Sequence, residues 1–230
     1  MLAPRMAGPK ALMAWSSGKD SAWALGLARG AGEVEVVGLL TTVAEGDGRV
    51  PMHGVGPELL DAQAAAVGLP LRRVPLPVPC ANEVYEARLG AELERARAEG
   101  VTHVVFGDLY LADIREFRER QLARAGMTAV FPLWHRGTAL TAEAMILGGL
   151  KARVTCLDPN KLPRALAGAE FDEDFVCGLP AGVDPCGENG EFHTFCHAAP
   201  CFRAPIGIKT GAVAEREGFV YADLLLDLSG

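Results

Sequence analysis

The stretch that most constrains the fold is an apolar strand that runs directly into a small turn rich in hydroxyl groups and then into a helix. Residues 12–15 form the strand, and the turn reads Ser16-Ser17-Gly18-Lys19-Asp20-Ser21. At such a junction the free N–H groups of the helix and the positive end of its dipole face the same point, which favours an anion. Gly18 lets the backbone approach a phosphate closely, and the three serine hydroxyl groups add donors. The stretch therefore predicts a phosphate-binding loop.

Two common phosphate-binding motifs do not fit this turn. A Walker A loop needs Gly five residues before its Gly-Lys pair and Ser or Thr after it, whereas this chain has Met13 and Asp20 there. No G-x-G-x-x-G dinucleotide fingerprint follows the strand. The turn resembles instead the Ser-Gly-Gly-x-Asp-Ser loop, or PP-loop, of the ATP pyrophosphatases, with Ser17 in place of the first Gly. Those enzymes cleave ATP between its α- and β-phosphates; an ordinary capped turn before a helix is the alternative.

The chain beyond the turn alternates predicted helices and strands. Helices are predicted at residues 21–29, 55–67, 82–99 and 113–124, and strands at residues 34–43, 71–74, 103–106 and 129–133. This alternation is typical of an α/β fold and predicts a Rossmann-like, doubly wound parallel sheet. Because half of its 230 residues are apolar, the chain can bury such a core.

The pattern changes at residues 132–137, which we interpret as a hinge between two domains. Beyond it we predict helices at residues 138–148 and 172–179, strands at residues 151–157 and 192–196, and a hairpin over residues 206–228. The hairpin is expected to turn at Glu217-Gly218. We therefore expect an ATP-binding domain of residues 1–133 and a second, smaller α/β domain of residues 134–230.

Polar residues that follow the predicted strands are candidates for the binding site, since ligands of a parallel sheet lie outside the carboxyl ends of its strands. Thr41 lies near the end of the second strand, and Gly107 and Asp108 follow the fourth. The helix that comes next carries several arginines, which either pair with glutamates on a solvated face or reach a phosphate. We expect at least one of them, Arg118, to contact the nucleotide.

A second stretch rich in functional side chains reads Gly187-Glu188-Asn189-Gly190-Glu191-Phe192-His193-Thr194. Its two glutamates are three residues apart in a glycine-containing loop and are followed by a histidine and a threonine. Such groups suit acid–base chemistry or the orientation of an amine or of Mg²⁺. The alternative is a simple turn before the strand predicted at residues 192–196.

Together these two stretches resemble the diphthine–ammonia ligase family, a branch of the adenine nucleotide α-hydrolase-like superfamily with a HUP-type fold. Shorter likenesses in the chain are Met52-His53, Val84-Tyr85-Glu86, Gly107-Asp108, Pro132-Leu133-Trp134 and Pro205-Ile206. The resemblance implies that ATP adenylates a carboxylate with release of pyrophosphate, and that ammonia captures the acyl-adenylate to give an amide. The cofactors it implies are ATP and Mg²⁺.

The resemblance also implies roles for individual side chains. Lys19 would neutralise charge during cleavage between the α- and β-phosphates. Asp20 would organise Mg²⁺ or the pyrophosphate site, and His53 would lie beside the nucleotide. The side chains expected at the acyl donor or acceptor are Glu188, Glu191 and His193.

One segment departs from the pattern of the family. Ligases that act on diphthine usually read Glu-Gly-Gly-Glu-x-Glu, whereas this chain has Asn189 and His193 in the second and sixth positions. These residues resemble a bacterial subgroup associated with corrinoid salvage. The acid substrate is therefore left open as diphthine, a corrinoid-related compound or another small molecule.

Charge and cysteine usage exclude several other classes. The formal net charge of −7 argues against nucleic acid as a partner. No apolar run approaches about 18 residues, and residues 1–10 lack the apolar core of a signal peptide, so we expect a cytoplasmic enzyme without a membrane partner. The six cysteines lack C-x-x-C spacing and are expected as free thiols. A zinc site is disfavoured because its candidate ligands match no common spacing. Those ligands are Cys186, His193, Cys196, His197 and Cys201.

Two other functions compete with the ligase, and a homodimer is a possible assembly for any of them. A non-catalytic sensor that binds ATP or AMP would keep the turn at residues 16–21 but would have no use for Glu188 and Glu191. Sulfur insertion into tRNA would need a basic face and a catalytic cysteine pair, which the net charge and the cysteine spacing disfavour.

Overall fold

A five-stranded parallel sheet forms the centre of the computed structural model, which describes residues 8–227. Its strand order is β3-β2-β1-β4-β5, and all four neighbouring pairs are parallel. The strands are β1 (Lys10–Ala14), β2 (Glu35–Ala44), β3 (Leu71–Leu76), β4 (His103–Val105) and β5 (Thr128–Val130). The order reverses on either side of β1, so the carboxyl end of β1 is the switch point at which such sheets bind ligands. The predicted Rossmann-like sheet is confirmed.

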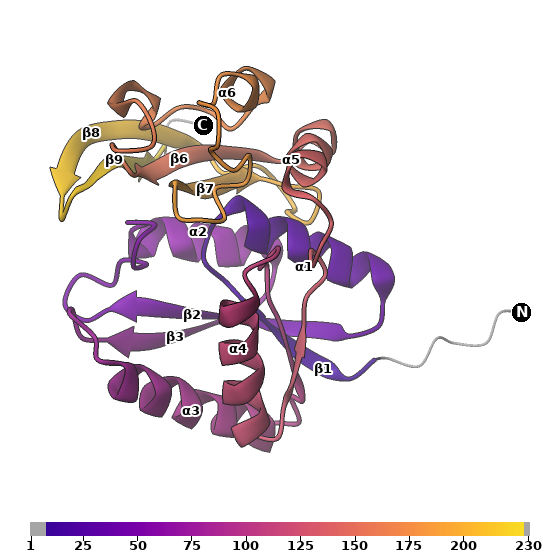
Figure 1. The fold of residues 1–230 in the computed structure, drawn as a ribbon. Helices are drawn as coiled ribbons and strands as arrows, with labels where there is room; N and C mark the ends of the chain where they lie inside the picture. The colour runs from indigo at the N-terminus through magenta and orange to yellow at the C-terminus, as the bar shows by residue number, and fades with distance from the viewer. Residues whose placement is uncertain (1–7, 228–230) are drawn as a thin grey trace, which may run out of the picture.

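Helices cover both faces of this sheet (Figure 1). One face carries α1 (Lys19–Ala31) and α2 (Pro57–Val67), and the other carries α3 (Asn82–Ala98) and α4 (Ala112–Arg124). Successive residues of a strand point to opposite faces, so Met13 packs in the cluster on the α1 side and Leu12 in the cluster that contains α3 and α4 residues. Burial on both faces explains why the strands read as continuous apolar runs.

A second sheet of four antiparallel strands, in the order β7-β6-β9-β8, lies over α1 and α2 (Figure 1). Its strands are β6 (Lys151–Leu157), β7 (Phe192–Ala198), β8 (Ile208–Arg216) and β9 (Phe219–Leu226). The short helical elements of this part are α5 (Thr138–Leu147), η1 (Arg164–Leu166) and α6 (Glu173–Cys177). Because α1 contacts β7 and α2 contacts β9, the two helices lie between the two sheets, and one apolar core joins both parts.

The predicted hairpin is confirmed: β8 and β9 pair around Glu217 and Gly218, both of which have positive φ. Its last predicted residue, Leu228, lies outside the described residues, as do the ends of the two predicted domains at 1–7 and 228–230. The domain boundary after residue 133 stays a prediction. Within residues 8–227, no helix is long and apolar enough to cross a membrane.

Two element ends differ from the prediction in ways that affect the site. Helix α1 begins at Lys19, two residues before the predicted start, since Gly18 is the extended N-cap residue with φ −83° and ψ 172°. Lys19 and Asp20 therefore belong to the first helical turn rather than to the loop. Strand β5 ends at Val130, before the predicted end at residue 133, and Pro132 could not have donated a ladder hydrogen bond there.

Candidate functional site

The loop between β1 and α1, residues 16–18, is held in shape by contacts from outside the parallel sheet. Ser17 has a φ of 70°, in the left-handed region that favours glycine, which explains why the PP-loop pattern has Gly at this position. Its carbonyl oxygen accepts hydrogen bonds from the Cys196 N–H and from Nε2 of Gln63, both at 2.9 Å. The buried Ser17 hydroxyl has no partner among the described residues. Strand β7 and helix α2 thus fix the path of the loop.

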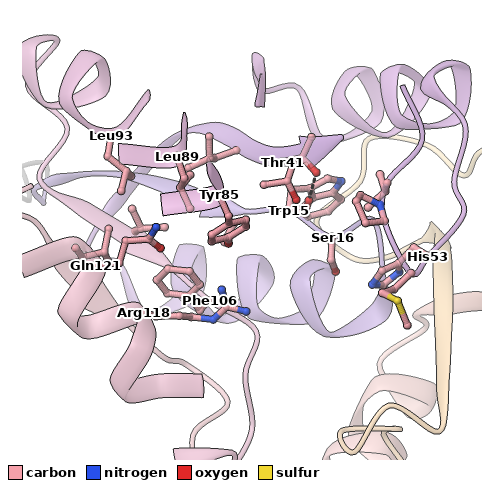
Figure 2. Close-up of a pocket in the computed structure, with 18 of the residues that line it drawn as sticks. Trp15, Ser16, Thr41, His53, Tyr85, Leu89, Leu93, Phe106, Arg118 and Gln121 are labelled. Carbon is pink, nitrogen blue, oxygen red and sulfur yellow. Dashed lines mark hydrogen bonds between the residues drawn. The ribbon is translucent and has the colours of Figure 1, made fainter. Parts of the chain in front are cut away.

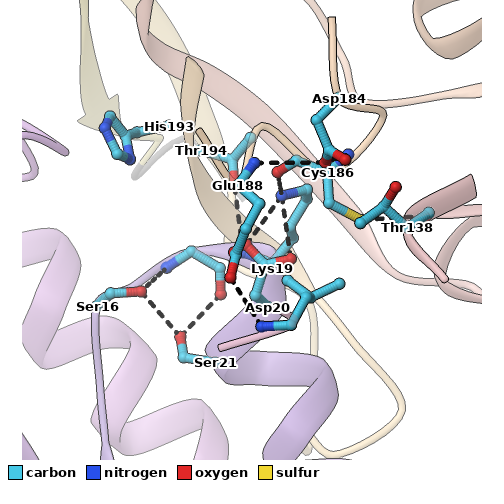
Figure 3. Close-up of polar contacts among 12 residues, drawn as sticks. Ser16, Lys19, Asp20, Ser21, Thr138, Asp184, Cys186, Glu188, His193 and Thr194 are labelled. Atoms are coloured by element: carbon cyan, nitrogen blue, oxygen red, sulfur yellow. Dashed lines mark hydrogen bonds and ion pairs between the residues drawn. The ribbon is translucent and has the colours of Figure 1, made fainter. Parts of the chain in front are cut away.

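Ser16 of the loop and Ser21 of α1 bond to each other and to the backbone of Gly18 (Figure 3). The Ser16 hydroxyl accepts from the Gly18 N–H at 3.3 Å and donates to the Ser21 hydroxyl at 3.3 Å. Ser21 in turn donates to the carbonyl of Gly18 at 2.9 Å. The Thr194 hydroxyl of β7 caps the first N–H of α1, since it accepts from the Lys19 N–H at 3.1 Å. The next residues of the first turn, Asp20 and Ser21, line the loop cavity described below, so the positive end of the helix faces this cavity.

Lys19 is almost fully buried, with 1% of its surface exposed, and its ammonium group joins the two parts of the molecule. Nζ lies 2.9 Å from Oδ2 of Asp20 and donates to the carbonyl of Cys186. It also lies 5.3 Å and 5.2 Å from the ring centroids of Phe171 and Phe192. Burial acts to lower the pKa of Lys19, but the carboxylate of Asp20 outweighs it and leaves that pKa raised. Lys19 is therefore charged and already partnered, and its contact with phosphate stays a prediction.

Glu188 reaches from the loop before β7 to the loop after β4. Its Oε1 accepts from the N–H of Leu109 at 2.8 Å and from that of Tyr110 at 3.4 Å. Burial raises the pKa of Glu188 to about 7; these two N–H groups oppose the shift, and the carboxylates of Asp20 and Asp108 add to it. Glu188 can therefore gain or lose a proton near neutral pH, as a general acid or base must.

Glu191, three residues further on, has a different environment. Only 2% of its surface is exposed, and its oxygens accept from the N–H of Asn189 at 2.9 Å, from the Asn189 side-chain amide at 3.0 Å and from the Asp184 N–H at 3.3 Å. Burial acts to raise its pKa, but these hydrogen bonds leave the pKa lowered. Glu191 lines neither of the two cavities described below. Its position favours the organisation of the loop over contact with a substrate.

His53 and His193 pack against each other, with ring centroids 4.8 Å apart. Nδ1 of His53 lies 3.0 Å from the carbonyl of Thr194, which can only accept, so Nδ1 carries the proton and Nε2 is free to accept. Burial, together with the charge of Lys19, lowers the pKa of His53 to about 4, and burial, with His53 and Lys19, lowers that of His193 to about 3. Both rings are therefore neutral at physiological pH.

Two cavities adjoin at the carboxyl ends of β1 and β4. The first, which we call the loop cavity, has a volume of about 220 Å³ and lies between the start of α1 and residues 186–194. The second, which we call the sheet cavity, has a volume of about 320 Å³ and extends under α3 and α4 (Figure 2). The residues that line both are Ala14, Ser16, His53, Phe106, Arg118 and His193. Predicted residues of both sequence stretches thus lie around one cleft, whereas Glu191 lies away from it.

Arg118 is the arginine of α4 that faces this cleft. Its Nε lies 2.9 Å from Oδ2 of Asp108, and its guanidinium carbon lies 4.7 Å from the ring centroid of Phe106. Arg115 and Arg120 instead pair with glutamates of their own helix and line neither cavity. Of the three arginines, Arg118 alone has the predicted position beside the site.

The predicted Thr41 and Gly107 support the cleft through the backbone. The Thr41 hydroxyl lines the sheet cavity and donates to the carbonyl of Trp15. A Cβ on Gly107 would lie 2.9 Å from the carbonyl carbon of Asp20, so only glycine lets the loop after β4 pack on the first turn of α1. A Cβ on Gly18 would lie 2.9 Å from Cε1 of His53. Packing within the protein by itself therefore favours glycine at position 18, and the approach of a phosphate there stays a prediction.

Sequence reasoning missed Gln121 and Phe106, which line the sheet cavity. Gln121 follows Arg118 by three residues on α4 and so lies on the same helix face, a spacing that could have revealed it. Phe106 closes the predicted fourth strand, and an apolar residue of a strand gives no sign of which cavity its ring faces.

The described residues 8–227 contain no group of three or more His, Cys, Asp or Glu side chains placed to hold a metal ion by themselves. The six cysteines are free thiols, as predicted. Burial raises the pKa of Cys186 to about 12, and its Sγ donates to the carbonyl of Thr138 at 3.3 Å. Cys186 is therefore an unreactive thiol that packs beside the loop cavity.

Comparison with known proteins covers the first part of the chain. Residues 9–129, more than half of the chain, match the family model described as the diphthamide synthase N-terminal domain. No curated protein matches the chain. The matched region runs from β1 into β5 and contains the loop at residues 16–18, whereas the loop with Glu188 lies beyond it.

Proposed function

The chain belongs to the family of the diphthamide synthase N-terminal domain, and from this premise we propose that it is an AMP-forming ligase that makes an amide from a carboxylate and ammonia. Membership makes it an ATP-utilising enzyme of the PP-loop type. The activity, the substrate and the roles below are our proposal. The partners we propose are a small-molecule or protein carboxylate and ammonia, in the cytoplasm, without nucleic acid.

One observation carries this proposal: the first turn of α1 and a carboxyl group with a pKa of about 7 line the same cavity. A site that only binds nucleotide needs the first of these features. The second is what a reaction with proton transfer near neutral pH needs. Glu188 also comes from the second part of the chain, so the fold brings it to the phosphate loop across the molecule.

The first turn of α1 would hold the phosphates through its N–H groups. Lys19 already bonds Asp20, and this pairing fixes the Asp20 carboxylate at the edge of the loop cavity, with 28% of the side chain exposed. Mg²⁺ usually binds through phosphates and one or two carboxylates, and the Asp20 carboxylate lines the cavity. Asp20 fits such an ion, which would neutralise phosphate charge when bound.

Glu188 would act as the base. In the second half of the reaction the nitrogen of ammonia bonds to the acyl carbon, the bond from that carbon to the AMP oxygen breaks, and the nitrogen loses a proton. The ionised Glu188 accepts this proton. The neutral His53 and His193 would line the path between the two cavities, and Nε2 of His53 could accept a hydrogen bond from a hydroxyl or amine of the bound substrates.

The loop with Glu188 supports a subgroup-specific substrate. Asn189, which differs from the pattern of diphthine ligases, accepts from the Tyr110 hydroxyl at 3.0 Å, and the Tyr110 N–H donates to Glu188. Asn189 is thus linked through Tyr110 to Glu188, the proposed base. We propose that the acid is a corrinoid-related or other small carboxylate, with diphthine as the alternative.

Chromatography of the nucleotide products tests the proposed reaction. The protein is incubated with ATP, Mg²⁺, ammonium and a panel of carboxylates, and AMP and pyrophosphate are expected with the correct acid. ADP and phosphate as the main products would contradict the proposal. A protein that binds ATP but turns over with no acid would favour the non-catalytic sensor.

A further inference from the structure

Gln121 is a buried amide that faces the sheet cavity without a hydrogen-bond partner. It lies on α4, only 8% of its surface is exposed, and it lines the cavity. Its Nε2 has no partner among the described residues. In Figure 2 it lies at the end of the cavity opposite to Ser16 and His53.

An unpaired buried amide is costly, so it calls for an explanation. Leaving such a group unsatisfied costs about 1–3 kcal/mol. Its neighbours along the cavity include Leu89, Leu93 and Leu122, which offer no hydrogen bond. The described residues contain two other unpaired buried side-chain atoms, on Ser17 and Thr141, and neither residue lines the loop cavity or the sheet cavity. Gln121 is the one of the three residues that lines the sheet cavity.

The walls of the cavity beside Gln121 are flat side-chain groups. The rings of Tyr85 and Phe106 both line it, and Figure 2 shows them between Gln121 and the Ser16 end. The planar guanidinium of Arg118 lies over the Phe106 ring, and Phe131 stacks on the same ring with centroids 5.4 Å apart. The Tyr85 ring and the Arg118 guanidinium are therefore the flat groups beside Gln121 on which a planar heterocycle could pack in one orientation.

We propose that Gln121 determines the base specificity of the nucleotide site by binding the edge of adenine that carries its amino group. Its Oε1 accepts from the exocyclic amine, and its Nε2 donates to the neighbouring ring nitrogen, a pairing that glutamine makes with adenine. The base then lies at the Gln121 end of the sheet cavity, and the phosphates extend past Ser16 to the start of α1. This inference rests on the proposed binding of ATP and assigns a recognition residue to it.

The proposal predicts that replacing Gln121 weakens nucleotide binding without lowering the stability of the protein. Because the Gln121 amide has no hydrogen-bond partner within residues 8–227, replacing it with the similarly shaped Met removes an unsatisfied group and breaks no hydrogen bond among those residues. Gln121→Met should therefore unfold at the same urea concentration as the parent or at a higher one. A glutamine kept for structural reasons would give the opposite result.

The test compares two nucleotides on two proteins by calorimetry. The nucleotides are ATP and purine ribonucleoside triphosphate, which lacks the amino group of adenine. Gln121→Met should bind ATP about ten-fold more weakly than the parent, which corresponds to the loss of one or two neutral hydrogen bonds. For the analogue the difference between parent and variant should be clearly smaller. Thr141→Val is the matched control, since it removes another unpaired buried group outside the cavity and should leave ATP binding unchanged.

The outcomes distinguish this inference from the function on which it rests. A parent that binds neither nucleotide would overturn both. A parent that binds ATP, together with a Gln121→Met variant that binds ATP equally well, would overturn the role of Gln121 alone. So would an equal loss of affinity for ATP and for the analogue, or a loss of stability in Gln121→Met, because either result indicates a structural role.

Discussion

The two loops that meet at the start of α1, residues 16–18 and residues 186–194, differ in the hydrogen bonds that hold them. In the loop at residues 16–18, Ser16 bonds to Gly18 and to Ser21, and the Thr194 hydroxyl of β7 accepts from the first N–H of α1. In the loop at residues 186–194, the Glu188 carboxylate is held by N–H groups of Leu109 and Tyr110, from the other part of the chain. In our proposal, binding and chemistry are thus supplied by different parts of the sequence.

The two glutamates of the loop at residues 186–194 also differ, in their hydrogen bonds and in the direction of their pKa shifts. The carboxylate of Glu191 accepts from three donors within the loop and belongs to a stronger acid than usual, with a lowered pKa. Glu188 is buried at the cavity with a pKa of about 7. When two carboxyl groups of one loop have pKa values shifted in opposite directions, they differ in role. We infer that Glu191 shapes the loop so that Glu188 can act.

The largest effect is expected where the two loops are joined, at Lys19. Lys19→Met would leave Asp20 and the carbonyl of Cys186 without the ammonium, and removal of one partner of a buried pair costs about 3–5 kcal/mol. Because Asp20 is partly exposed, we expect about 3 kcal/mol from urea unfolding. Lys151→Met, at an exposed lysine of β6, is the control and should change stability by less than about 0.5 kcal/mol. Equal stability of the two variants would break the proposed link between the loops.

The next effect concerns turnover. Glu188→Gln keeps an oxygen that can accept from Leu109 and Tyr110 but cannot take a proton, so kcat should fall about 100-fold while ATP affinity is kept. The parent should show a rise in rate with an apparent pKa of about 7, and the variant should lack it. A pH–rate profile that is the same in both proteins would remove Glu188 from the chemistry.

Glu191→Gln should mainly lower the stability of the protein, whereas Glu188→Gln mainly lowers turnover. Its new amide group would face donors where the carboxylate accepts three hydrogen bonds, so we expect a loss of about 2 kcal/mol in the free energy of unfolding. Any residual activity should keep the pH dependence of the parent. A variant as stable as the parent but inactive would mean that Glu191, and not Glu188, takes part in the chemistry.

The pH dependence of the free energy of unfolding tests the raised pKa of Glu188. The pKa of Glu188 is raised from 4.5 to about 7 in the folded protein, so the folded state binds the proton more tightly than the unfolded chain. The resulting stabilisation is fully present below pH 4.5 and is lost as the pH rises through about 7. His53 and His193 shift stability in the opposite direction, so the quantity to measure is the stability of the parent minus that of Glu188→Gln. It should fall between pH 5 and about 7.5, and a flat difference would contradict the raised pKa.

The smallest effect is expected in the first loop. Ser17→Gly should relieve a left-handed backbone that costs a non-glycine residue about 1–2 kcal/mol, partly offset by the greater freedom of the unfolded chain. We expect a gain of about 0.5–1 kcal/mol. Ser17→Ala keeps the Cβ and removes only the unpaired hydroxyl, so it measures the contribution of that group. A loss of stability in Ser17→Gly would show that the Ser17 hydroxyl stabilises the folded protein.

The sequence was enough to predict the parallel sheet and the convergence of loops at its edge, because strand ends in such a sheet share one side. Arg118 and Glu188, which were predicted for the site, both line the loop cavity, and their roles there stay predictions. It could not predict that Lys19 turns toward Cys186, since that contact spans the chain. Nor could spacing separate Glu188 from Glu191, because their difference comes from burial and from donors supplied by the folded loops.

A crystal structure with ATP and Mg²⁺ bound tests the central claim most directly, namely that both loops form one site. We predict phosphate oxygens at hydrogen-bond distance, about 3 Å, from main-chain N–H groups of the first turn of α1. The Glu188 carboxylate should face the α-phosphate side of the loop cavity. Phosphates bound away from the start of α1, or a nucleotide that leaves Glu188 remote from the α-phosphate, would contradict the claim.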